Sequence, residues 1–117
     1  MIKRILDDLV SEENGIQAAI FLDGEGETIV QSGDYDVEVR LIGAWKEIQL
    51  DRIKDISKRL KFGEVHAVLF SLDQGKELVL PVVDEYCLVL LLSVTADFRD
   101  ALNKAGSAAE LLKKDIS

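Results

Sequence analysis

The sequence holds one histidine, His66, and one cysteine, Cys87, which are residue types often used as general base, thiol nucleophile or zinc ligand. A catalytic triad or a zinc site needs several such groups that converge on one point, and the lone histidine has no partner at a usable spacing. Cys87 begins a strongly apolar run, where a buried thiol is inert. We therefore predict a structural or surface role for His66, inside a strand, and a packing role for Cys87.

Two carboxylates stand among glycines in the segment Asp23-Gly24-Glu25-Gly26, a composition that invites a calcium-binding interpretation. The calcium loop of an EF-hand spreads its oxygen ligands over twelve residues, whereas here an apolar run follows at once. The glycines are not followed by a helix, as a nucleotide-binding glycine motif requires. An Asp-Gly between two apolar runs is typical of a β-hairpin turn. The sequence therefore predicts no metal site, no cofactor and no catalytic residues.

Length and composition are those of one globular domain. The 117 residues are 48% apolar and 31% charged, with a single proline, and predict one domain over residues 1–117. A net charge of −8 disfavours nucleic acid and anionic membranes, which attract basic surfaces. The N-terminus lacks the apolar stretch of a signal peptide, and the longest apolar run is too short to span a membrane. With its single cysteine, the chain is expected in the cytoplasm, without direct membrane insertion.

Hydrophobic periodicity predicts an α-β-β-α-β-β-β-α order of elements. These are a helix over the first dozen residues, strands at 16–22 and 28–30, a helix at 35–60, strands at 65–72, 77–83 and 86–94, and a helix to residue 116. Asp34 and Asp97 are candidate caps for the second and third helices, and Gly63 is expected to end the long one. Pro81 predicts an irregularity in its strand, because proline cannot donate to a neighbouring strand.

The strand at 86–94 is apolar on both faces of its pleat and should be covered by helices on both sides. The order of elements predicts an α+β sandwich with one five-stranded antiparallel sheet. The long helix is expected on one face of this sheet, and the first and last helices on the other.

The helix at 35–60 carries more apolar surface than one sheet face covers. One stripe, predicted to face the sheet, holds Val37, Leu41, Ala44 and Ile48, and a second stripe, about a quarter turn further round, holds Ile42, Ile53, Ile56 and Leu60. Val39 and Leu50 widen the arc, and Trp45 could face the core or an interface. If the strand at 65–72 lies at the sheet edge, it has no proline or lysine to block pairing with another chain.

Two-fold pairing with a second copy would cover both the second stripe and the strand edge. The residues predicted at this interface are Val39, Ile42, Trp45, Ile53, Ile56, Val65, Ala67 and Leu69. Asp34, Asp36 and Glu38 at the helix start complement the helix dipole or, alternatively, contact a basic partner.

Several segments resemble the Roadblock/LC7 family over nearly the whole chain. They are the stretch 15–26 (GIQAAIFLDGEG), Ile29-Val30, the long helix, Val79-Leu80-Pro81-Val82 and Tyr86-Cys87-Leu88-Val89-Leu90. The resemblance implies a profilin-like α/β fold in which two copies pair their third strands and pack their long helices antiparallel. It also implies a non-catalytic dimeric platform: members include dynein light chains, scaffolds for Ras-like GTPases, and a bacterial activator of a Ras-like GTPase.

The leading hypothesis is a non-catalytic homodimer, paired through residues 35–60 and 65–72, that binds a Ras-like small GTPase across the paired helices. Arg40, Arg52 and Arg59 are candidates on the helix surface if GTP hydrolysis is stimulated. Two alternatives are open: a small-ligand sensor of the profilin or PAS-like kind, with a pocket between sheet and helix, and a structural subunit like a motor light chain.

Overall fold

The order of helices and strands agrees with the order predicted from hydrophobic periodicity. The computed structural model describes residues 1–11, 15–33, 39–73 and 75–116, with the side chains of 39–48 excepted. The elements are α1 (Ile2–Ser11), β1 (Ile16–Leu22), β2 (Thr28–Gly33), α2 (Val39–Arg59), β3 (Val68–Leu72), β4 (Gly75–Pro81), β5 (Cys87–Leu92) and α3 (Phe98–Ile116).

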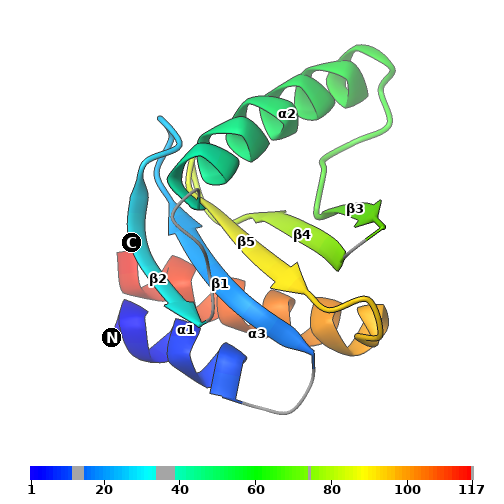
Figure 1. Cartoon of the computed structure of the whole chain (residues 1–117). Helices are drawn as coiled ribbons and strands as arrows, with labels where there is room; N and C mark the ends of the chain where they lie inside the picture. Colours follow the sequence, from blue (N-terminus) through cyan, green and yellow to red (C-terminus); the bar gives the residue numbers. More distant parts are fainter. Residues whose placement is uncertain (12–14, 34–38, 74, 117) are drawn as a thin grey trace.

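The strands form one antiparallel sheet in the order β2-β1-β5-β4-β3. Helices α1 and α3 cover one face of the sheet, and α2 lies across the other (Figure 1). β5 is central because its side chains are apolar on both sides and each side is buried under a helix layer. The predicted α+β sandwich is confirmed.

Each sheet face has its own core. On the face of α1 and α3, buried side chains that include Leu6, Phe21, Leu88 and Leu112 form the larger cluster. On the face of α2, the described side chains form a smaller cluster, to which α2 contributes Leu50. Because successive side chains of a strand point to opposite faces of the sheet, β1 and β5 contribute side chains to both clusters.

Two predicted turn features are confirmed. Asp97 caps α3: its Oδ1 accepts hydrogen bonds from the backbone N–H groups of Arg99 at 3.0 Å and Asp100 at 3.4 Å. The Asp23 carboxylate accepts from the N–H groups of Glu25 and Glu27, at 2.9 and 3.0 Å, inside the β1–β2 hairpin. Asp23 therefore organises its own turn.

The predicted strand at 65–72 is too long, because β3 begins only at Val68. The Val82 N–H donates to the Tyr86 carbonyl, 2.9 Å away across the β4–β5 pair, so the preceding residue, Pro81, turns its nitrogen toward the β3 side. Extending the Val68–Val79 pairing by two residues would set His66 opposite this proline, which has no N–H to donate. Residues 65–67 therefore lie in the linker before β3.

The irregularity predicted at Pro81 is wrong as well. The β4–β5 register runs without a shift from the Lys76–Leu92 pair to the Pro81–Cys87 pair. Pro81 is the last residue of β4, so its missing donor shortens the neighbouring edge strand and leaves β4 itself regular.

The long helix ends at Arg59, one residue before the predicted end, and the residue that closes it is Lys61 and not the predicted Gly63. Lys61 has a left-handed φ of 59°, its N–H donates to the Lys58 carbonyl, and the Phe62 N–H donates to the Ser57 carbonyl at 3.0 Å. This pair of bonds is a Schellman motif with a lysine where glycine is usual. The predicted start of the helix at residue 35 and its cap at Asp34 lie outside the described residues.

Candidate functional site

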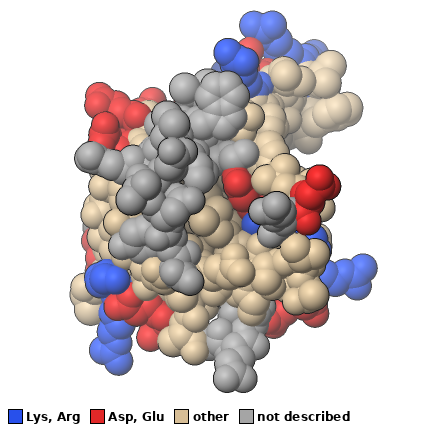
Figure 2. Space-filling model, viewed as in Figure 1, with Lys and Arg blue, Asp and Glu red and all other residues tan. Residues whose placement is uncertain are grey.

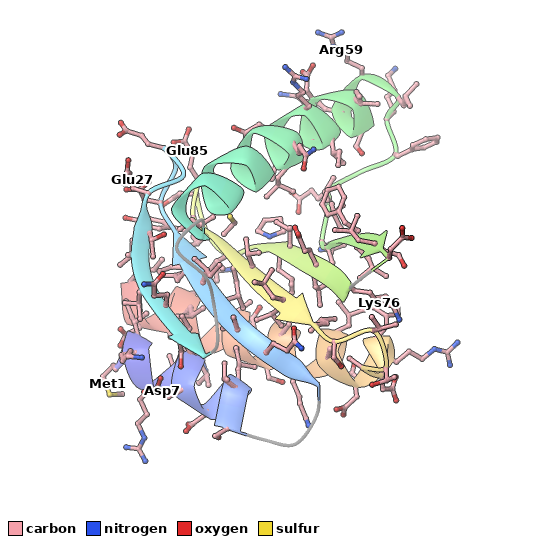
Figure 3. All side chains as sticks on the ribbon, viewed as in Figure 1. Met1, Asp7, Glu27, Arg59, Lys76 and Glu85 are labelled. Atoms are coloured by element: carbon pink, nitrogen blue, oxygen red, sulfur yellow. The ribbon has the colours of Figure 1, made fainter. Side chains whose placement is uncertain are left out.

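The second half of α2 is the most exposed apolar part of the described chain. Leu50 is only 1% exposed, but Ile56 and Leu60 are 54% and 57% exposed, and Phe62, just after the helix, is 81% exposed. Figure 1 shows why: the C-terminal end of α2 stands away from the sheet, and the linker descends from it to β3. Arg59, near the tip of the helix, points away from the sheet (Figure 3).

β3 is an edge strand, as its predicted role in pairing requires. Because Val68 and Phe70 exchange hydrogen bonds with β4, Leu69 and Ser71 turn their backbone N–H and C=O groups outward. Its side chains are half-buried up to Phe70 and exposed at Ser71 and Leu72. The strand VLFSL contains none of the charged or proline residues that usually block an open edge.

The other sheet edge, β2, is covered by α1. The Lys3 Nζ donates to the Gln31 carbonyl of β2 at 3.0 Å and pairs with the Asp7 carboxylate at 2.9 Å. The Asp7 carboxylate also accepts a hydrogen bond from the buried Ser32 hydroxyl of β2. The hydrogen bond from Ser32 and the charge of Lys3 hold the pKa of Asp7 below its usual value of 3.8.

This depressed pKa predicts an acid-sensitive contact between α1 and β2. Because the folded state favours the ionised carboxylate, the contact contributes stability above the unfolded pKa and loses it as pH falls through the lower folded pKa. We expect Asp7→Asn to be less stable than the wild type at pH 7, with the difference closing as the pH falls to about 2. Urea unfolding midpoints measured across this range test it.

The control for this prediction is Asp8→Asn, which removes the same charge from the neighbouring exposed position of α1. The Asp8 carboxylate has no hydrogen-bond or salt-bridge partner among the described residues. Equal changes in the pH profile of the two variants would show that the Asp7 contact contributes nothing specific.

The predicted interface residues fall into three groups. The first group lies in α2, where the backbone is described but the side chains are not: Val39, Ile42 and Trp45. Ile53 is half-buried and Ile56 is exposed on α2. The third group is half-buried: Val65 packs toward the cluster under α2, whereas Ala67 and Leu69 pack toward the α1 and α3 face.

Sequence reasoning missed Phe62, exposed just after α2, and Leu72, exposed at the end of β3. Phe62 is a lone aromatic residue in a polar stretch after the helix, which was the available signal. Leu72 ends an edge strand, and its exposure follows from topology, which the sequence does not display.

The described residues offer little chemistry. His66 is exposed in the linker, which corrects its predicted position in a strand, and Cys87 is fully buried, which confirms its packing role. Arg59 pairs with Asp55 at 3.2 Å, and both are exposed. Among the described side chains, no three His, Cys, Asp or Glu residues gather where they could hold a metal ion.

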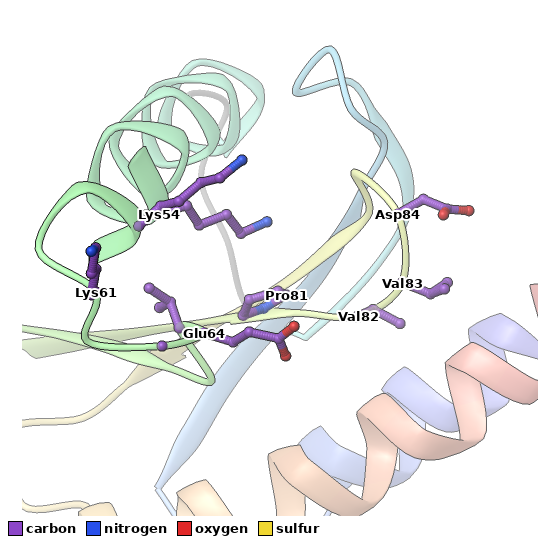
Figure 4. Close-up of a pocket in the computed structure, with 10 residues that line it drawn as sticks. Lys54, Lys61, Glu64, Pro81, Val82, Val83 and Asp84 are labelled. Carbon is purple, nitrogen blue, oxygen red and sulfur yellow. The ribbon is translucent and has the colours of Figure 1, made fainter. Parts of the chain in front are cut away.

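A cavity of about 760 Å³ opens between α2 and the sheet. Its walls are the C-terminal half of α2, the linker after it and the turn between β4 and β5 (Figure 4). Lys54, Lys58 and Lys61 line one side, and Val65, Pro81 and Val83 line the other. A cavity between helix and sheet is what the small-ligand alternative predicted.

The same end of α2 is basic in an otherwise acidic chain. Residues 52–61 carry Arg52, Lys54, Lys58, Arg59 and Lys61 against the single carboxylate of Asp55, while the whole chain has a net charge of −8. Figure 2 shows Lys and Arg side chains gathered over this end of the helix. The candidate site is therefore an exposed apolar and basic surface next to an open strand edge.

Comparison with solved structures identifies the architecture. A Roadblock/LC7 domain from Streptomyces avermitilis superposes with a TM-score of 0.89 at 16% identity, over 97% of this chain and 96% of that one. The chain has the Roadblock/LC7 fold. MglB from Myxococcus xanthus also superposes with a TM-score of 0.89, at 13% identity, over 98% of this chain and 94% of that one.

The fold extends to profilins, as the profilin-like prediction implied. Profilin II from Acanthamoeba castellanii matches with a TM-score of 0.71 at 13% identity, over the full length of both chains. No family model and no curated protein sequence matches this chain. Within the described residues, none of the helices is both long enough and apolar enough to cross a membrane.

Proposed function

We propose that residues 1–117 form one Roadblock/LC7-like domain that works as a homodimeric adaptor without catalytic residues of its own. The observation that carries this proposal is the apolar surface of Ile56, Leu60 and Phe62, which lies exposed beside the open edge of β3. Pairing of two copies through α2 and β3 would remove both from water. Apolar surface exposed this densely usually marks an interaction site.

The backbone of β3 supports this pairing. Leu69 and Ser71 turn their hydrogen-bonding groups outward, so a second β3 running antiparallel would find donors and acceptors at matching positions. A two-fold axis through this contact would join two five-stranded sheets into one. Five of the interface residues predicted from the sequence have described side chains and are half-buried or exposed: Ile53, Ile56, Val65, Ala67 and Leu69. The structure adds Phe62 to this set.

Charge supports an antiparallel arrangement of the long helices. The sequence just before α2 carries Asp34, Asp36 and Glu38, whereas residues 52–61 carry five basic side chains and one acidic one. Antiparallel pairing brings the acidic start of each helix near the basic end of its twin. Such complementarity favours one orientation over the parallel one.

The partner that we propose is a Ras-like small GTPase, bound in the cytoplasm across the paired helices. The Roadblock/LC7 resemblance implies this class of partner, and the fold shared with MglB supports the resemblance. One MglB structure is described as having a tetrameric arrangement, which is consistent with self-association in this fold. Any stimulation of hydrolysis would act by positioning groups of the GTPase, and Arg40, Arg52 and Arg59 are the candidates on α2 for a direct contribution.

Two measurements test the proposal. Sedimentation at micromolar concentration should give a dimer, and a clean monomer would contradict it. Mixing the protein with the Ras-like GTPase encoded nearest to its gene should give a complex in gel filtration. A complex with an unchanged GTP hydrolysis rate would reject the activator version and keep the adaptor, whereas a dimer that binds no GTPase would favour a structural subunit like a motor light chain.

A further inference from the structure

The cavity beside α2 has a basic wall made by three of the five basic side chains at this end of the helix. Lys54, Lys58 and Lys61 are four and three residues apart, so they follow one face of α2 and its end. None of the three has a carboxylate within ion-pair distance in the described part of the chain. Lysines in the last helical turn complement the dipole, but Lys54 lies before that turn and is half-buried.

The opposite wall of the cavity is mainly apolar. Val65, Pro81 and Val83 line it, and all three are only partly exposed. Two carboxylates also belong to the lining, Glu64 and Asp84. Figure 4 shows that Glu64 extends below Pro81, whereas Asp84 points away from the helix and its lysines. Positive charge therefore exceeds negative charge on the side where Lys54 reaches over the cavity.

We propose that this cavity binds a small amphiphilic anion: an apolar body that carries one carboxylate or phosphate group. The volume of about 760 Å³ lies within the range of about 300–1,000 Å³ typical of small-molecule sites. The lysines would hold the anionic group, and the valines and the proline would contact the apolar body. A lipid bilayer fits less well, because the chain as a whole has a net charge of −8.

All residues of the site belong to a single chain, although Val65 and the lysines also belong to the surface proposed for pairing. The bound anion would neutralise lysines at the tip of α2, the end of the helix that contributes the exposed apolar side chains. Ligand and partner binding would therefore act on one structural element.

The test uses a fluorescent amphiphilic anion, 8-anilinonaphthalene-1-sulfonate, titrated into the folded full-length chain. We expect saturable binding that decanoate displaces. The double variant Lys54→Gln with Lys58→Gln should bind the probe about tenfold more weakly, because two exposed ion pairs to the anion are lost. Circular dichroism should show an unchanged fold, since Lys54 is half-buried and Lys58 exposed.

The matched control is the double variant Lys113→Gln with Lys114→Gln. It also removes two charges from the C-terminal part of a helix, but on α3. Its affinity for the probe should stay within about twofold of the wild type, because neither of these lysines lines the cavity. Equal weakening in both double variants would overturn the assignment, because it would show a net-charge effect.

A second variant tests the apolar wall without touching the lysines. Val83→Glu adds a carboxylate to the wall of the cavity and should weaken binding of the probe and of decanoate. Wild-type affinity in this variant and in the Lys54, Lys58 variant would overturn the proposal. Binding to phosphatidylglycerol vesicles without displacement by decanoate would also overturn it, in favour of a membrane surface.

Discussion

Ile56→Asp is expected to convert the protein from a dimer to a monomer. Ile56 is 54% exposed on α2 in the single chain, so the substitution should leave the fold intact. In a two-fold dimer it acts twice, and each buried isoleucine contributes about 1.5–3 kcal/mol. The dissociation constant should rise by roughly two to four orders of magnitude, measured by sedimentation over a dilution series.

The control is Leu111→Asp, on α3. Leu111 is 52% exposed, close to the value for Ile56, and it lies on the other side of the sheet. It should leave the dimer as it is. If Leu111→Asp dissociates the dimer and Ile56→Asp leaves it intact, the interface lies on the α1 and α3 face instead. Ile53→Asp, at a half-buried position of the same α2 surface, should also weaken association.

Leu50→Ala is expected to give the largest loss of fold stability on the α2 side. Leu50 is 1% exposed and joins α2 to the small cluster of Ile20, Leu22, Val79, Cys87 and Val89. Removing a buried leucine side chain leaves a cavity and costs about 2–5 kcal/mol. Urea unfolding at one fixed protein concentration measures the loss, because the stability of a dimer depends on concentration.

Leu111→Ala is the matched control for this loss, since the same atoms are removed from an exposed helical position. We expect its free energy of unfolding to change by no more than about 0.5 kcal/mol. Equal losses in the two variants would mean that Leu50 does not anchor α2. If Leu50→Ala lowers the free energy of unfolding strongly and also weakens the dimer, then the packing of α2 on the sheet and the pairing of two copies depend on each other.

The two variants separate two properties of one helix. Leu50 holds α2 on the sheet, whereas Ile56, six residues later, faces away from the core. A helix that packs on the sheet at its middle and is exposed toward its end can present side chains to a partner without unfolding of the domain. This is the physical basis of the proposed adaptor function.

The apolar pattern predicted most of the fold because periodicity is a local property. An unbroken apolar run in β5 requires cover on both faces wherever the strand lies, and a 3.6-residue period in α3 requires a helix. The cap at Asp97 and the turn at Asp23 were predictable for the same reason, since their hydrogen bonds join residues no more than four positions apart.

The errors came where one element limits another. β3 begins at Val68 because Pro81, on the neighbouring strand, has no N–H to donate to the residues that precede Val68. Gly63 was predicted to close α2, but Lys61 takes the left-handed conformation there, although glycine adopts that conformation more easily than lysine.

The sequence by itself determined the order of elements, the antiparallel sandwich and the surplus of apolar residues on the long helix, because each follows from spacing along the chain. Only the tertiary structure decided where that surplus is exposed. Leu50 and Ile56 both belong to the apolar arc of α2, yet one is buried and the other is exposed. The six-residue step between them turns Ile56 about 120° away from the direction of Leu50, and the C-terminal end of α2 stands away from the sheet. The cavity at this end is lined by Lys54 and Pro81, which lie far apart in the sequence.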